Sequence, residues 1–191
     1  MKTIDCVLKL EFEKFLEWEI YNKENEIRYE YDDYPNGIEI ENIIRMIPND
    51  FHISLDSINL ILYFLSKDDE REIIMEILEE KSILGYLVAR KGIKYLDMNA
   101  RWQVAVLLAY FKDTKLLIEM IENDEEEYVR RRALLGLRHL DKTSSEKLAI
   151  NHLKSPYEYE RMVAIDTLNF LSSSYFNKAL NILKNDTSSG C

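Results

Sequence analysis

The pattern of apolar positions repeats along the second half of the chain. In residues 130–140 an arginine is followed by apolar residues three, seven and ten positions later, which is the spacing of one helical face. The same pattern follows Arg101, Arg130 and Arg161, and a shorter copy follows Arg71. The steps between these arginines are 30, 29 and 31 residues. A nearly fixed period of this length predicts stacked structural repeats.

A second apolar segment follows each of the three clearer copies after a short polar break. The breaks read KDT, DKTSS and SSSY. Their hydroxyl residues are candidate helix N-caps, namely Thr114, Ser144 or Ser145, and Ser174. Each repeat is therefore predicted to be a helical hairpin. Because one hairpin cannot bury both of its apolar faces, neighbouring hairpins are expected to stack.

The segment EEEYVRRRALLGL resembles the HEAT-like repeat, in which an acidic residue precedes Val-Arg-x-x-Ala-x-x-x-Leu. The resemblance covers about residues 66–186 and implies an all-α, right-handed α-solenoid of helical hairpins. It also implies structural roles for three arginines, whose guanidinium groups would bind carboxylates or loop carbonyls of a neighbouring repeat: Arg101, Arg130 and Arg161. The third copy departs from the pattern, since Glu160 stands where valine is usual. Arg131 and Arg132 are expected to be solvated.

Residues 1–50 differ from the repeat region, residues 51–191, and are predicted to form an atypical acidic helical cap. They hold 13 acidic and 6 basic side chains. A helix is expected over about residues 5–26, with one apolar face formed by Leu8, Phe12, Phe15, Leu16 and Ile20. Residues 26–41 fit a short hairpin around Asn36-Gly37 or an irregular loop, and the loop is favoured. Further helices are predicted at 39–47 and 54–66, with a turn at Pro48 to Asp50.

Tyrosines and carboxylates alternate in this acidic region. Tyrosine supplies contact area at low entropic cost, and carboxylates attract a basic partner. The sequence therefore predicts a partner-binding segment that comprises Tyr21, Tyr29, Tyr31, Asp32, Asp33 and Tyr34. The alternative is a solvated acidic loop whose tyrosines are half-buried against the first hairpin.

Composition narrows the class of protein. The 191 residues carry a net charge of −10, with few glycines and prolines, which favours an all-α fold and argues against nucleic acid as a ligand. The two cysteines, Cys6 and Cys191, form no disulfide framework, so a reducing cytoplasm is expected. Charged residues interrupt the N-terminal apolar stretch, and the apolar runs are too short to span a membrane.

No residue pattern indicates catalysis. The three histidines are His52, His139 and His152, and no pair has metal-ligand spacing. His152 lies on the apolar face of a predicted helix and is expected to be a hydrogen-bonded, half-buried side chain. There is no glycine-rich phosphate loop and no evident nucleophile with a base. The sequence predicts neither an enzyme nor a bound cofactor or metal.

The resemblance to HEAT repeats implies a concave surface lined by the second helices, with exposed Glu119, Glu122, Asn151 and Lys154. Size, acidity and repeat type together resemble the immunity proteins of bacterial toxin systems. This implies a monomeric protein that binds a basic toxin, such as a nuclease, and covers its active site. A general protein scaffold is the alternative. A HEAT-like DNA glycosylase fits less well, because it needs a basic concave face and residues 51–191 still carry −3. A bilin lyase fits less well because nothing in the sequence suggests a bilin partner.

Overall fold

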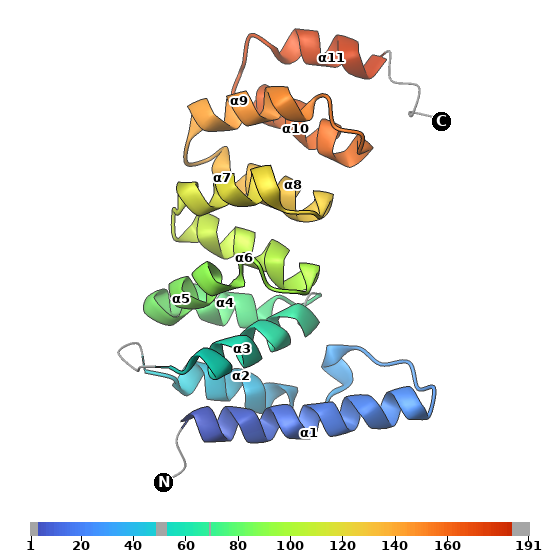
Figure 1. Ribbon diagram of the computed structural model, residues 1–191, viewed down its shortest axis with the longest axis vertical. Helices are drawn as coiled ribbons and strands as arrows, with labels where there is room; N and C mark the ends of the chain where they lie inside the picture. The colour runs from blue at the N-terminus through green and yellow to red at the C-terminus, as the bar shows by residue number, and fades with distance from the viewer. Residues whose placement is uncertain (1–3, 49–52, 69, 185–191) are drawn as a thin grey trace. The chain divides into compact units, whose positions relative to one another are not determined.

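The computed structural model describes residues 4–48, 53–68 and 70–184, with only the backbone described at 182–184. Within these ranges every regular element is helical, so the predicted all-α class is confirmed. The elements, drawn in Figure 1, are α1 (Ile4–Glu24), η1 (Tyr31–Asp33), α2 (Gly37–Met46), α3 (Leu55–Lys67), α4 (Ile73–Glu80), α5 (Ser82–Gly92), α6 (Met98–Tyr110), α7 (Thr114–Asn123), α8 (Glu127–Leu137), α9 (Lys142–His152), α10 (Glu158–Phe170) and α11 (Phe176–Lys184). Asn49, Asp50, His52 and Cys191, which appear in the predictions above, lie outside the described residues.

The chain divides into two compact units, residues 1–107 and 108–191. The first holds α1 to α5 and most of α6, and the second holds the end of α6 and α7 to α11. Residues 1–50, expected to form a cap, pack together with residues 51–107, since α1 contacts α3 and α2 contacts α4. The two units also differ in charge. The first has 22 acidic and 13 basic side chains, and the second has 13 and 12, giving net charges of −9 and −1.

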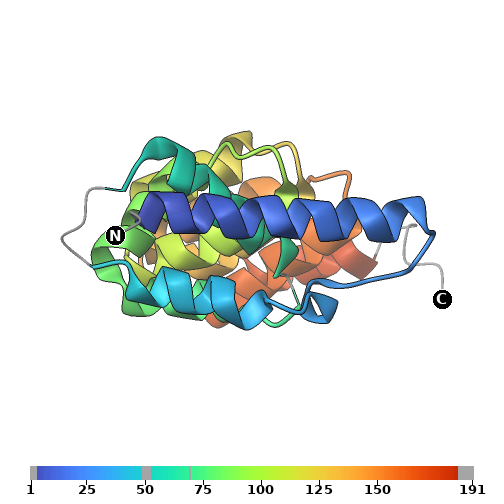
Figure 2. The same cartoon turned by 90° about the horizontal axis from the view of Figure 1, so that it is seen from below.

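An aromatic cluster around Phe15 forms much of the core of the first unit. Helix α1, which runs across the picture in Figure 2, packs against α2 and α3. Five rings lie 5.0–6.0 Å from the ring of Phe15, those of Trp18, Tyr31, Tyr34, Tyr63 and Phe64. The predicted apolar face of α1 is correct at Leu8 and Phe15, which are buried, and wrong at Ile20, which is exposed. Glu11 and Glu19 are buried on this helix instead.

Residues 26–36 form a loop and not half of a hairpin, and residues 37–41 are already helical. The loop contains the short 3-10 helix η1, and helix α2 begins directly at Gly37. At the start of η1 the backbone N–H of Glu30, the N-cap residue, donates to Asp33 Oδ2 at 2.9 Å. Asn36-Gly37, the candidate hairpin turn, is therefore the start of a helix.

Helices α8 and α10 pack against each other in the second unit, where α7 contacts α8, and α9 and α11 contact α10. Helices α7 and α9 each have an aspartate as the N-cap. The hydroxyl residues that follow these aspartates, which were the predicted caps, lie inside the helices. Asp113 accepts from Leu116 N at 3.1 Å, and Asp141 accepts from Ser144 N at 3.0 Å. A carboxylate at the N-cap also interacts favourably with the helix dipole, which a hydroxyl group cannot do.

The repeat arginines share one hydrogen-bonding geometry. Each guanidinium Nη1 donates to the carbonyl oxygen six residues earlier, at 2.8 Å for Arg101, 2.7 Å for Arg130 and 2.8 Å for Arg161. Arg101 and Arg130 also donate to the carbonyl five residues earlier, at 3.0 Å in both cases. Each arginine thus holds the loop that precedes its own helix. Arg71 departs from this pattern, because it lies before α4 and pairs with Asp32 at 3.1 Å.

Candidate functional site

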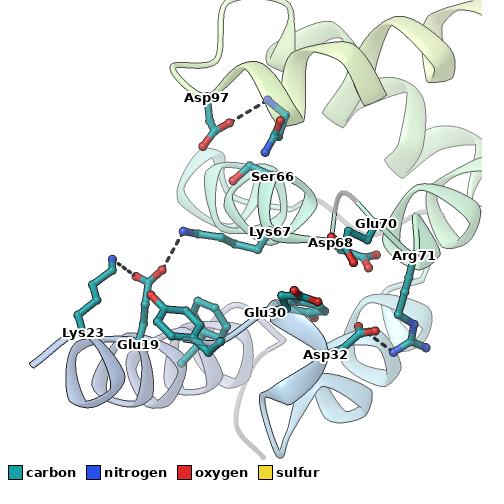
Figure 3. Close-up of a pocket in the computed structure, with 14 residues that line it drawn as sticks. Glu19, Lys23, Glu30, Asp32, Ser66, Lys67, Asp68, Glu70, Arg71 and Asp97 are labelled. Atoms are coloured by element: carbon teal, nitrogen blue, oxygen red, sulfur yellow. Dashed lines mark hydrogen bonds and ion pairs between the residues drawn. The ribbon is translucent and has the colours of Figure 1, made fainter. Parts of the chain in front are cut away.

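A pocket of about 350 Å³ lies in the strongly negative first unit (Figure 3). Side chains from α1, η1, α3, the α3–α4 loop and the start of α6 line it, and we call it the acidic pocket. Its lining residues are Phe15, Glu19, Lys23, Tyr29, Glu30, Tyr31, Asp32, Ser66, Lys67, Asp68, Glu70, Arg71, Asp97 and Asn99. Six of these are acidic and three are basic, so the charges within the pocket are not balanced.

One end of the acidic pocket is neutralised by an ion-pair network around Glu19. Glu19 accepts from Lys67 at 2.8 Å and from the hydroxyl of Tyr63 at 3.0 Å, and it pairs with Lys23 at 3.2 Å. Figure 3 shows its carboxylate between the two lysines. Burial alone would raise the pKa of Glu19, but the hydrogen bonds from Lys67, Lys23 and Tyr63 lower it below its usual value. The carboxylate is therefore ionised and already partnered.

The other end of the acidic pocket contains a buried carboxylate, that of Asp68, which has no basic partner in the part of the chain that the structure describes. Asp68 is 2% exposed, and its Oδ2 accepts from the backbone N–H of Ile74 at 2.7 Å, at the start of α4. Among the described residues no cation lies within ion-pair distance of it. Burial raises the pKa of Asp68 to about 6, against the hydrogen bond from Ile74 and the charge of Arg71, which both lower it. Its ionised form is thus poorly compensated.

Tyr31 lines the same pocket and has an unpartnered hydroxyl group. The side chain is 8% exposed, and its ring lies 6.0 Å from that of Phe15. The hydroxyl is buried and forms no hydrogen bond within the described part of the chain. Burial raises the pKa of Tyr31, and the negative charge of Asp68 raises it further. A buried hydroxyl without a partner is costly, as is a buried carboxylate without a cation.

Exposed carboxylates surround the mouth of the acidic pocket. Asp32 pairs with Arg71 at 3.1 Å, and Glu30 lies 3.9 Å from Arg28. Glu70 is exposed and has no ion-pair partner in the ranges that the structure describes. The α3–α4 loop thus supplies Asp68 and Glu70, two site residues that the sequence reasoning missed. The run of acidic residues after Lys67 is the sequence feature from which these two site residues could have been predicted.

The predicted partner-binding residues of the first unit do not form one exposed surface. Tyr31 and Tyr34 are interior side chains, 8% and 6% exposed, because both pack edge-on or tilted against Phe15. Tyr21 is exposed on α1 outside the pocket. Tyr29 is half-buried against Trp18, with ring centroids 4.9 Å apart. Asp32 and Asp33 are exposed, and Asp33 also caps η1.

A second, more open hollow of about 410 Å³ lies in the second unit, and we call it the Glu160 groove. Three of the four residues predicted to line a concave surface border it: Glu122, Asn151 and Lys154. All three are exposed, whereas Glu119 is half-buried on α7 and is not among the lining residues.

Glu160 lies at the base of this groove and is 2% exposed. Arg130 donates to it through Nε at 2.7 Å and Nη2 at 3.2 Å, His152 Nδ1 lies 2.8 Å from Oε1, and the Ser155 hydroxyl donates to Oε2. Burial alone would raise the pKa of Glu160, but the hydrogen bonds from His152, Arg130 and Ser155 lower it to about 2. Glu160, at the position where the sequence pattern predicts valine, therefore forms a buried ion pair that joins α10 to α8.

Arg131 is not the solvated side chain that was expected. It pairs with Glu127 at 2.6 Å, and its guanidinium lies over the rings of Tyr128 and Tyr159, 5.0 and 5.2 Å from their centroids. The flat, weakly hydrated guanidinium stacks readily on aromatic faces, which explains why it is mostly covered. Arg130 and Arg131 are thus both packed side chains of the second unit.

Within the described ranges no group of three or more His, Cys, Asp or Glu side chains is arranged to hold a metal ion. The helices of those ranges are also too short or too polar to cross a membrane. Among protein-family models, curated proteins and solved structures, none matches this chain.

Proposed function

We propose that the chain is a non-catalytic protein-binding protein that binds a basic protein partner through the first unit. Its role would be that of an immunity protein, which neutralises a cationic toxin such as a nuclease by covering the active site. It would act as a monomer in the cytoplasm. No nucleic acid, membrane or cofactor is part of the proposal.

The charge distribution supports this proposal most directly. The first unit carries −9 of the total −10, and its pocket contains twice as many acidic as basic side chains. A concentration of one sign of charge steers an oppositely charged protein and raises its rate of association. Aromatic side chains beside these carboxylates, such as Tyr29, supply the apolar area that a stable contact needs.

We further propose that the repeats are HEAT-like and follow a right-handed path. The shared geometry of Arg101, Arg130 and Arg161 supports the repeat, since each arginine fixes the preceding loop in the same way, and the right-handed path is what the resemblance to HEAT repeats implies. A crystal structure in which the hairpins follow a left-handed path would contradict this part of the proposal.

Affinity capture from the native cell's lysate, with bound proteins identified by mass, is the first experiment. The expected result is one stoichiometric basic protein that stops growth when it is expressed alone, with growth restored when this chain is co-expressed. Several substoichiometric proteins, or a single partner without toxicity, would contradict the immunity role.

Two matched charge reversals test the binding surface. Glu70→Lys changes the rim of the acidic pocket, whereas Glu76→Lys makes the same change at an exposed residue of α4 that does not line the pocket. Binding to the captured partner, measured by surface plasmon resonance, should weaken at least about tenfold for Glu70→Lys, since like charges placed in a contact cost several kcal/mol. Equal affinities for the two variants would exclude the pocket as the contact surface.

A further inference from the structure

We propose that the acidic pocket binds one arginine side chain of the basic partner, with Asp68 and Tyr31 as the groups that the guanidinium reaches. This inference rests on the proposed function, because it specifies what the pocket recognises. It concerns the end of the pocket opposite Glu19, where the protein's own cations leave negative charge unpaired.

Two separate observations indicate that a cation binds here. One is the burial of the Asp68 carboxylate, and the other is the burial of the Tyr31 hydroxyl. Asp68 is 2% exposed without a cation in ion-pair distance among the described residues, and the Tyr31 hydroxyl is buried without a hydrogen-bond partner there. Most buried polar groups of folded proteins have a hydrogen-bond partner, so a buried hydroxyl without one, beside a carboxylate without a cation, marks a place where a further donor or cation can bind. Both side chains line one pocket, so one entering cation could satisfy both.

Among the described residues, the nearby cations form their ion pairs with carboxylates other than Asp68. Lys67 and Lys23 bind Glu19, and Figure 3 shows both directed to that end of the pocket. Arg71 is held by Asp32 at the rim. A cation from outside the chain can therefore approach Asp68 without first breaking an ion pair.

A guanidinium suits this end of the pocket better than an ammonium. The acceptors come from different elements, Tyr31 from η1 and Asp68 from the α3–α4 loop, with Glu70 at the rim. A planar group with five N–H donors can bind acceptors on several sides, whereas an ammonium is a compact point charge. The aromatic rings that line the pocket also offer faces on which a guanidinium stacks.

The test is a titration at pH 7.5 with three capped tripeptides, Ac-Gly-Arg-Gly-NH2, Ac-Gly-Lys-Gly-NH2 and Ac-Gly-citrulline-Gly-NH2. Binding is followed by the NMR shift of the Ile74 amide, which donates to Asp68. We expect saturable shifts with the arginine peptide, several-fold weaker binding of the lysine peptide and none of the citrulline peptide. Equal responses to arginine and citrulline, or no response to arginine, would overturn the inference.

Substitutions identify the groups involved. Asp68→Asn keeps an oxygen that can accept from Ile74 N–H but removes the charge. Binding of the arginine peptide should therefore weaken about tenfold or more, because hydrogen bonds between charged groups are stronger than those to neutral ones. Asp56→Asn, at an exposed carboxylate in the first turn of α3, is the matched control and should leave binding unchanged. If Asp68→Asn does not fold, Tyr31→Phe decides, because it removes only the hydroxyl. Unchanged binding in the decisive variant contradicts the inference.

The same variants separate this inference from the proposed function. If Asp68→Asn binds the captured partner as tightly as the parent protein while Glu70→Lys binds it weakly, the arginine pocket is wrong and the function stands. If the arginine peptide binds through Asp68 but no basic partner is captured, the pocket stands and the proposed function is wrong.

Discussion

Glu160 is a residue whose environment reverses the usual cost of burying a carboxylate. An ionised group removed from water is destabilising unless its partners replace the lost hydration. Here Arg130, His152 and Ser155 together donate to both carboxylate oxygens, and the pKa is held at about 2. Asp68 shows the opposite balance, since one backbone N–H leaves its charge undercompensated. These two carboxylates therefore predict opposite dependences of stability on pH.

Glu160→Gln should destabilise the protein at pH 7 by about 3 kcal/mol, because a pKa lowered from 4.5 to about 2 corresponds to that free energy. A lowered pKa stabilises the folded state fully above about pH 4.5, and this contribution is lost as the pH falls to about 2. Urea unfolding at pH 7 and pH 3 should therefore show a smaller difference from the parent protein at pH 3. Glu158→Gln, an exposed neighbour, is the control. A difference that is equally large at both pH values would mean that the carboxylate charge is not what stabilises the fold.

Asp68→Asn should show the reverse trend. The pKa of Asp68 is raised from 3.8 to about 6 in the folded protein. Folding is therefore favoured when Asp68 is protonated, and the protein loses stability as the pH rises from about 4 to 6. The free energy of unfolding of the variant relative to the parent should rise by about 3 kcal/mol across that range. The measurement is the same urea titration, repeated in steps between pH 4 and pH 7. A constant difference would show that Asp68 is well compensated.

Close helix packing in the first unit depends on Gly92, the last residue of α5. A Cβ atom there would lie 2.5 Å from Val104 Cγ2 on α6 and 2.7 Å from Leu62 Cδ2 on α3. Both distances are shorter than van der Waals contact. Glycine is thus required at this position by the approach of two other helices, although alanine is the better helix former.

Gly92→Ala should lower stability by about 1–3 kcal/mol, the usual cost of an added methyl group in a packed core, which exceeds the gain of at most about 1 kcal/mol in helix propensity. The melting temperature is the readout. Adding Val104→Ala to the variant removes the closer clash, so the penalty of Gly92→Ala should be smaller in that background. An alanine variant as stable as the parent would show that the helices shift apart at little cost.

The helices with apolar periodicity were predictable from the sequence, because the spacing of buried residues is a local property. The faces after Arg101, Arg130 and Arg161 begin in α6, α8 and α10, and Ala133 and Leu137 are fully buried as expected. The last position of each face lies just beyond its helix, at Phe111, Leu140 and Leu171. The buried polar groups were not predictable. Glu19 is buried because Lys67, 48 residues away, reaches it, and no local pattern indicates that pairing.

The candidate site was predicted only in part for the same reason. The sequence indicated the acidic tyrosine segment, and Tyr29, Tyr31 and Asp32 do line the acidic pocket. The partner-binding interpretation placed Tyr31 on the surface, because alternation with charged residues resembles an exposed segment, whereas the alternative had the tyrosines half-buried. The aromatic cluster around Phe15 draws the ring inward, and its contacts come from residues distant in the chain. Asp68 and Glu70 join the site through the same tertiary packing.

The charge of the whole molecule makes association with a basic partner depend on salt. With a net charge of −10, of which the first unit carries −9, long-range attraction should dominate the encounter. The association rate constant for the captured partner should fall at least about tenfold between about 50 and 300 mM salt, while the dissociation rate constant changes little. Stopped-flow fluorescence measures the first and surface plasmon resonance the second. Glu76→Lys and Glu70→Lys should slow association similarly, but only Glu70→Lys should speed dissociation, because only that residue lies at the pocket. An association rate constant independent of salt would mean that shape and apolar contact, not charge, bring the partners together.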